Sequence, residues 1–187
     1  MHIYIKNMVC DRCIMVVKDE FEKLGYPTLK VQLGEVEVAG DLTADKISAI
    51  DNHLNKFGFE IIDNTKSRII EKIKNVIVQL IHHSNGDGLK VNYSTYIESH
   101  LNKDYNYLSN LFSEVEGTTI EKYIIHQKIE KVKELLVYDE LTLGEIASKM
   151  GYSNVAYLSA QFRKVTGLTP THFKQVKENK RIPLDKI

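Results

Sequence analysis

Cysteine and proline are scarce in this chain, and long apolar runs are missing. Its 187 residues contain two cysteines, Cys10 and Cys13, and three prolines. Two cysteines so close together exclude a fold held by a disulfide framework. No stretch approaches the roughly 18 consecutive apolar residues of a membrane span, and the first residues show no basic leader before an apolar run. We therefore expect a cytoplasmic protein with no membrane partner.

Sequence motifs typical of enzymes are missing as well. Nothing resembles a nucleophile beside its base or a pair of carboxylates in a pocket, and Gly86-Asp87-Gly88 is too short for a phosphate-binding glycine loop. We therefore expect that the protein is not an enzyme.

Net charge is zero for the whole chain, but its parts differ. Residues 1–63 carry 7 basic and 11 acidic side chains, a net charge of −4, and residues 64–187 carry 18 and 14, a net charge of +4. From Thr142 onward, 8 basic side chains outnumber 3 acidic ones. This asymmetry favours two domains with different partners, and a nucleic acid as the partner of the second.

Strand and helix patterns alternate through the first 63 residues. Residues 2–6 and 59–62 are typical of strands, and residues 29–38 of a hairpin that turns at Gly34-Glu35. Two helices are predicted from apolar stripes that end at a glycine: Ile14, Val17, Phe21 and Leu24 before Gly25, and Ile47, Ile50, Leu54 and Phe57 before Gly58. The order βαββαβ predicts a ferredoxin-like domain.

The two cysteines lie between the first strand and the first helix. Sulfurs at a helix N-terminus can point at one site, where the helix dipole favours thiolate, and thiolates prefer soft ions such as Cu(I) or Zn(II). Because the chain has no further cysteine, a four-cysteine zinc site within one chain is excluded. A low-coordinate site, or one shared between two chains, stays open.

A known family shares this loop. Asn7-Met8-Val9-Cys10-Asp11-Arg12-Cys13, the element order and Phe57-Gly58-Phe59 resemble the heavy-metal-associated domain of copper chaperones and metal-transporting ATPases. The resemblance implies that Cys10 and Cys13 bind metal and that Met8 packs beneath the loop. Asn7 stands where the family usually has glycine. The charged pair Asp11-Arg12 leaves the identity of the ion open.

Two other interpretations remain for this domain. It can be a docking module, or it can carry out thiol–disulfide chemistry. A thioredoxin-like site also needs a cis-proline that faces the sulfurs, and Pro27 is poorly placed for that role. We therefore favour metal binding.

A helical region follows, and it contains an internal repeat. A helix is predicted from residue 65 to about His83, where His82 and His83 form a polar helix end, and residues 84–88 break it. Tyr107 to Gly117 then matches Tyr157 to Gly167 at a constant offset of 50 residues. In both copies three apolar residues share a face: Leu108, Phe112 and Val115, and Leu158, Phe162 and Val165.

Each repeated helix follows a shorter one across a turn, which is helix-turn-helix spacing. The shorter helices are predicted at residues 94–101 and 142–150. Between the two units, residues 119–138 are predicted to form one helix, about 28 Å long at 1.5 Å per residue. This length is close to the roughly 34 Å between successive major-groove segments, so one chain could occupy both.

Residues 65–175 contain motifs of a second family. They include Lys128-Ile129-Glu130-Lys131-Val132-Lys133-Glu134-Leu135-Leu136, Leu143-Gly144-Glu145-Ile146-Ala147, Gly151-Tyr152-Ser153 and Gly167-Leu168-Thr169-Pro170. They resemble the DNA-binding domain of AraC-type transcription regulators. The resemblance implies base contacts by Asn106, Ser109 and Asn110, and by Asn154, Ala156, Ser159 and Ala160. It implies phosphate contacts by Arg163, Lys164 and Lys174.

Three features depart from that family. Ala160 replaces a long polar side chain, Glu114 and Glu116 stand where basic residues are common, and the small-molecule barrel of many members is absent. The predicted fold class is α+β: a ferredoxin-like domain at residues 1–63, then an all-α domain at residues 64–187 with two helix-turn-helix units joined by a long helix.

We expect a sequence-specific transcription regulator that binds double-stranded DNA as a monomer or weak homodimer. DNA binding needs no cofactor, whereas Cu(I), Zn(II) or a metal-delivering protein acts on the first domain. The alternative is a metal carrier or adaptor whose helical half docks on a partner protein. A steep loss of duplex binding with salt separates the two classes.

Overall fold

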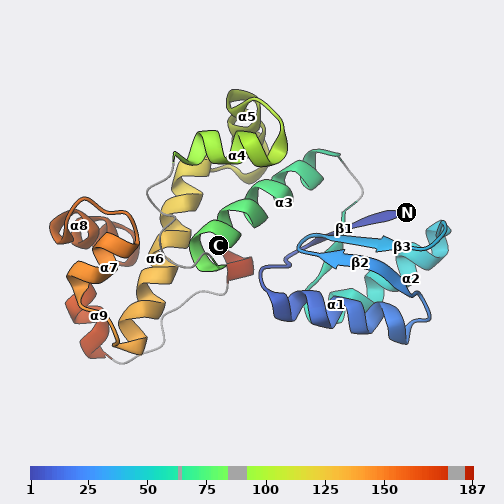
Figure 1. Cartoon of the computed structure of the whole chain (residues 1–187), viewed down its shortest axis with the longest axis horizontal. Helices are drawn as coiled ribbons and strands as arrows, with labels where there is room; N and C mark the ends of the chain where they lie inside the picture. Colours follow the sequence, from blue (N-terminus) through green and yellow to red (C-terminus); the bar gives the residue numbers. More distant parts are fainter. Residues whose placement is uncertain (63–64, 84–91, 177–183) are drawn as a thin grey trace. The chain divides into compact units, whose positions relative to one another are not determined.

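The computed structural model describes residues 1–62, 65–83, 92–176 and 184–187, and the chain divides into two compact units, residues 1–75 and 76–187. The predicted break at residues 84–88 lies outside the described residues. None of the described helices combines the length and the apolar composition needed to cross a membrane. The protein is a mixed α/β chain, with a small antiparallel sheet first and helices after it (Figure 1).

The first unit follows the element order that the sequence predicts. Its elements are β1 (His2–Lys6), α1 (Asp11–Lys23), β2 (Thr28–Gln32), β3 (Glu35–Val38), α2 (Ala44–Leu54), the 3-10 turn η1 (Asn55–Phe57) and β4 (Glu60–Ile61). The strands form one sheet in the order β2-β3-β1-β4, and every paired neighbour is antiparallel.

The side chains of β1 point alternately to the two faces of this sheet. Ile3 and Ile5 are buried in the core with Val17 and Phe21 of α1, because alternate side chains of a strand point to one face. Phe57, predicted to extend the buried stripe of α2, is instead 48% exposed, because α2 ends at Leu54 and a 3-10 turn changes the direction of the side chains.

Helix α3 (Thr65–Val78) begins in the first unit and ends in the second. Its first turns cover the other sheet face, where the Arg68 guanidinium lies 4.5 Å from the centroid of the Tyr4 ring. Gly34 allows this approach, since a Cβ there would lie 2.4 Å from Nδ2 of Asn75. The hairpin turn therefore needs glycine for packing, and also for its positive φ of 76°.

The second unit is helical throughout its described residues. Its elements are the end of α3, the π-helical turn η2 (Gln79–His83), α4 (Tyr93–Leu101), α5 (Tyr105–Glu116), α6 (Ile120–Tyr138), α7 (Leu143–Lys149), α8 (Val155–Thr166), α9 (Pro170–Val176) and the 3-10 turn η3 (Leu184–Lys186). Helix α6 contacts α5, α7, α8 and α9, so it is the central support of this unit (Figure 1).

His82 and His83 lie in the last turn of η2, at the predicted polar helix end, and His82 is partly buried. Its Nε2 lies 2.8 Å from Oε1 of the fully buried Gln127, whose amide donates to the Tyr123 hydroxyl at 3.0 Å. Burial lowers the pKa of His82 to about 4. The hydrogen bond with Gln127 depends on the packing of η2 against α6, a contact that the local sequence does not report.

Candidate nucleic-acid interface

The two helices of the sequence repeat, α5 and α8, begin and end in the same way. Asp104 caps α5 by accepting a hydrogen bond from the Tyr107 backbone N–H at 3.0 Å, and Asn154 caps α8 by accepting from Tyr157 at 2.8 Å. Each helix ends at a left-handed residue, Gly117 or Gly167. The repeat in the sequence is therefore a repeat in structure, since equivalent residues set equivalent helix ends.

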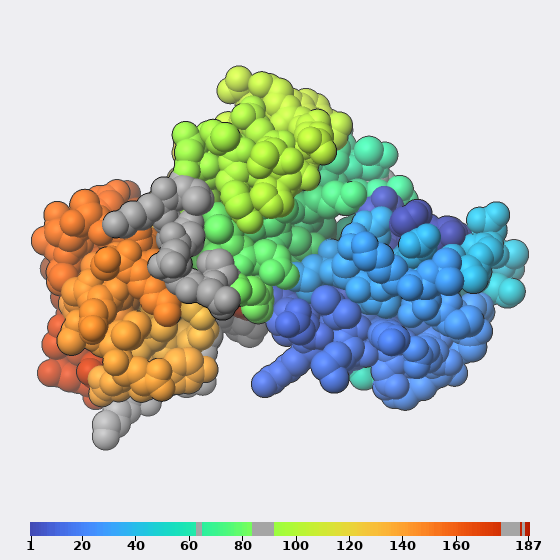
Figure 2. Space-filling model, viewed as in Figure 1, coloured from blue at the N-terminus to red at the C-terminus, as the bar shows by residue number. Residues whose placement is uncertain are grey.

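A shorter helix precedes each helix of the repeat, as the spacing predicts. Helix α4 leads to α5 through Asn102, whose φ is 51°, and α7 leads to α8 through Gly151, whose φ is 69°. Thr142 and Glu145 form a reciprocal capping box that starts α7. Two helix-turn-helix units result. They occupy separate regions of the surface in Figure 2, in yellow-green (α4–α5) and orange (α7–α8).

Helix α5 presents polar residues on its outward face. Asn106, Tyr107 and Asn110 are exposed and Ser109 is partly buried. Val115, predicted to be on the buried face, is 44% exposed, and Leu111 is buried there in its place. The buried face of α5 is therefore centred on Leu108, Leu111 and Phe112, which leaves Val115 at its edge.

Helix α8 exposes smaller side chains and two cations. Ala156, Ala160, Arg163 and Lys164 are exposed, and Ser159 is partly buried. Two further residues that were predicted to contact DNA have partners within the protein. The carboxamide oxygen of Asn154 accepts the capping hydrogen bond, and Lys174 on α9 pairs with Asp139.

Sequence reasoning missed two aromatic residues on these helices. Tyr107 and Tyr157 are 49% and 55% exposed at equivalent positions. The Lys103 ammonium lies 5.9 Å from the Tyr107 ring centroid, and Tyr157 meets Tyr152 edge-on at 5.8 Å. Their identity in both copies of the repeat was the available signal, because a tyrosine kept at an exposed position is not explained by core packing.

The cysteine loop lies in the first unit. The sulfurs of Cys10 and Cys13 are 3.6 Å apart and both cysteines are free. Cys10 is the N-cap residue of α1, and its carbonyl oxygen accepts the Cys13 backbone N–H at 2.9 Å. Met8 is fully buried in the core next to the loop. Burial raises the pKa of the Cys13 thiol, which opposes the thiolate that a helix N-terminus favours.

Asn7 explains how this loop forms without the expected glycine. Its φ is 69°, in the left-handed region where asparagine is one of the few tolerated side chains. Its amide also donates to the Gly58 carbonyl at 2.8 Å, which anchors the loop to the end of η1. Asn7 therefore holds a left-handed backbone conformation here without being glycine.

The two sulfurs alone fit a soft ion. A tetrahedral ion with sulfur bonds of about 2.3 Å separates its sulfurs by roughly 3.8 Å, close to the separation found here. Within the described residues, no group of three or more His, Cys, Asp or Glu side chains could hold a metal. The described part of the chain therefore offers two ligands from this loop and no complete metal site.

Known proteins are similar to the helical half of this chain. Residues 98–175 match the family described as a helix-turn-helix domain. The structure is similar to that of a transcriptional regulator with an AraC-type DNA-binding domain from Chromobacterium violaceum, with a TM-score of 0.50 and 19% identity over 63% of this chain and 99% of that one. The family match places a helix-turn-helix domain at residues 98–175.

Two further proteins are similar to this chain. The C-terminal domain of AraT, a response regulator from Geobacillus stearothermophilus, is 25% identical over 64% of this chain and 95% of that one, with a TM-score of 0.50. The HTH-type transcriptional regulator YtdP of Bacillus subtilis is 27% identical over 128 residues, which are 67% of this chain. The chain spans only 16% of the length of YtdP.

Proposed function

We propose that this chain is a transcription regulator that reads a bipartite DNA site with α5 and α8. The observation that carries the proposal is the pair of helix-turn-helix units, whose recognition helices start at equivalent caps and expose equivalent faces. Relatives named as transcriptional regulators support it. The helix-turn-helix units support DNA binding, and a role in regulation is the additional part of the proposal.

Two classes of contact follow from the exposed faces. We assign base contacts to Asn106, Ser109 and Asn110 on α5, and to Asn154, Ala156, Ser159 and Ala160 on α8. Alanine suits contact with thymine methyl groups in the major groove. We assign phosphate contacts to Arg163, Lys164 and Lys174, because basic side chains position a protein on the duplex without reading its sequence.

Selection of bound duplexes from a random DNA pool tests the proposal. A regulator should enrich two short motifs about one helical turn apart. Affinity for the selected duplex should fall steeply as salt increases, because phosphate contacts release counterions. If nothing is enriched and duplex binding is weak at low salt, the helical half is an adaptor that docks on another protein.

We also propose that Cys10 and Cys13 bind a thiophilic ion, Cu(I) or Zn(II). The support is the 3.6 Å separation of two free sulfurs at the start of α1. The sheet order β2-β3-β1-β4 with both helices between strands further supports a ferredoxin-like domain of the heavy-metal-associated kind. A second chain or a metal-delivering protein would supply further ligands.

A further inference from the structure

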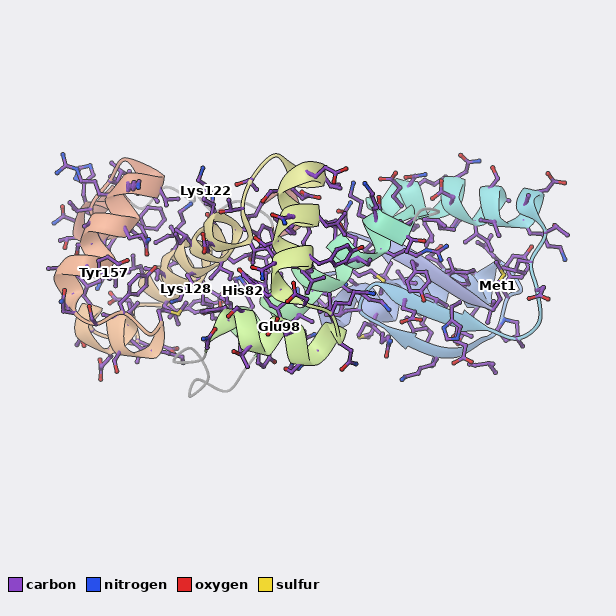
Figure 3. The ribbon with its side chains drawn as sticks, turned by 90° about the horizontal axis from the view of Figure 1, so that it is seen from above. Met1, His82, Glu98, Lys122, Lys128 and Tyr157 are labelled. Atoms are coloured by element: carbon purple, nitrogen blue, oxygen red, sulfur yellow. The ribbon has the colours of Figure 1, made fainter. Side chains whose placement is uncertain are left out.

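Lys128, labelled in Figure 3, lies in the middle of α6 and is partly buried. Its ammonium lies 4.7 Å from the ring centroid of Tyr152 and 5.7 Å from that of Tyr93. Tyr93 is the first residue of α4, and Tyr152 lies in the turn between α7 and α8. One cation on the connecting helix therefore contacts both helix-turn-helix units.

The contact is made through the faces of the rings. Both tyrosine hydroxyl groups are buried and have no hydrogen-bond partner among the residues that the structure describes. Within the same residues, Lys128 makes no ion pair with a carboxylate. Burial lowers the pKa of Lys128 to about 8, so at neutral pH most of the population keeps its charge. A partly buried ammonium between two rings makes a stronger cation–π contact than an exposed one.

The contact of Lys128 with the two rings is directional, whereas the surrounding apolar packing is not. Hydrophobic contacts of α6 with α7 and α8 resist separation, but they depend little on direction. A cation held over two ring faces constrains where both rings lie, because the attraction falls away from the ring axis. Displacement of either unit moves its tyrosine away from Lys128.

We infer that Lys128, Tyr93 and Tyr152 form a clamp that sets the orientation of the two helix-turn-helix units and thereby the spacing of the two half-sites that the protein accepts. Lys128 is a positioning residue, since it acts through the two rings and not by touching DNA. The inference rests on the proposed function for its consequence on DNA, but not for the clamp itself. A rigid pair of units selects one spacing because both must engage together.

The first experiment needs no DNA. Spin labels are attached at Asn110→Cys and Ala160→Cys, equivalent exposed positions on α5 and α8, in the full chain with Cys10→Ser and Cys13→Ser. Pulsed electron spin resonance should give a narrow distance distribution that broadens in Lys128→Met and stays narrow in Lys128→Arg. Lys122→Met is the matched control, because it removes the same charge from an exposed position on the same helix.

The second experiment measures affinity for the selected duplex, with and without one inserted base pair between the half-sites. The unlabelled protein should lose affinity by about 100-fold on insertion, and Lys128→Met by less than about tenfold. Tyr93→Phe should behave as the original protein, whereas Tyr93→Leu should behave as Lys128→Met. The leucine variant also tests the clamp if Lys128→Met does not fold.

The outcomes distinguish failure of the clamp, failure of its role in half-site selection and failure of the proposed function. An equally narrow distribution in Lys128→Met and the original protein overturns the clamp, whatever happens on DNA. Retained spacing discrimination in Lys128→Met and Tyr93→Leu overturns its role in half-site selection. Absence of duplex binding by the original protein overturns the proposed function and that role, while the spin-label distances still decide whether the clamp exists.

Discussion

The ring of Phe162 meets the ring of Phe173 edge-on, with centroids 5.5 Å apart. Fifty residues earlier, Phe112 and Tyr123 pack at 5.6 Å. In each case a recognition helix is attached to the helix that follows it by one aromatic pair. Such pairs add to the burial of their surface and favour tilted or edge-on geometry, so they hold the helix as well as covering it.

Truncation of this contact should destabilise the second unit. Phe162 is fully buried, so Phe162→Ala should lower the free energy of unfolding by about 3–5 kcal/mol through lost burial and a cavity. Urea unfolding measures the change. Val115→Ala, at a 44% exposed position on the equivalent helix, should stay within about 0.5 kcal/mol. Equal effects of the two variants would contradict the assigned core.

Base and phosphate contacts should differ in what they change. Asn110→Ala should alter the preference at one or two base pairs, at a cost of about 1–3 kcal/mol for the preferred base. Arg163→Ala should weaken binding to all duplexes similarly and reduce the salt dependence. Competition binding against a set of single-base variants distinguishes the two. Unchanged preference in Asn110→Ala would show that another face of α5 meets the groove.

The cysteines should bind an ion without holding the fold together. Titration with Cu(I) against a competing chelator should load the reduced protein, and Cys10→Ser with Cys13→Ser should abolish uptake. The double variant should unfold at nearly the same urea concentration, because the core of the first unit consists of apolar residues from the strands and helices. Equal uptake by both proteins would eliminate the site.

Metal should alter DNA affinity by way of α3, which supplies residues to both units. Couplings between sites in one protein are typically about 1–3 kcal/mol, and DNA must shift metal affinity by the same factor. Affinity for the selected duplex is measured at one salt concentration for the apo protein, the metal-loaded protein and the double cysteine variant. If the three affinities agree within error, metal binding in the first unit does not control DNA binding.

Stability should fall in mild acid because of His82. Its pKa is about 4 in the folded protein against 6.5 for an ordinary histidine, so the unfolded chain binds the extra proton between these values. The contribution is therefore fully present above pH 6.5 and is lost as pH falls toward 4. Between pH 7 and pH 5 the loss should be about 2 kcal/mol.

His82→Gln is the matched variant for that titration, since an amide retains hydrogen-bonding capacity toward Gln127 and does not ionise in this range. Unfolding experiments at several pH values should show a shallower slope for the variant. The same slope in both proteins would mean that other groups cause the acid dependence.

Local patterns in the sequence determined the elements of this protein. The apolar stripes, the glycines that end helices and the capping residues Thr142, Asp104 and Asn154 act within a few neighbouring residues, so the sequence alone locates each helix-turn-helix unit. The fifty-residue repeat then identified α5 and α8 as equivalent helices, because equivalent residues cap and end them.

Only the tertiary structure decided which distant residues meet. The hydrogen bond of His82 with Gln127 and the position of Lys128 between Tyr93 and Tyr152 depend on how α6 packs against η2, α4 and the α7–α8 turn. No periodicity reports such contacts, because a histidine or lysine has the same local pattern in water as in a core. Their environment, and with it their pKa and their role, comes from segments far away in the chain.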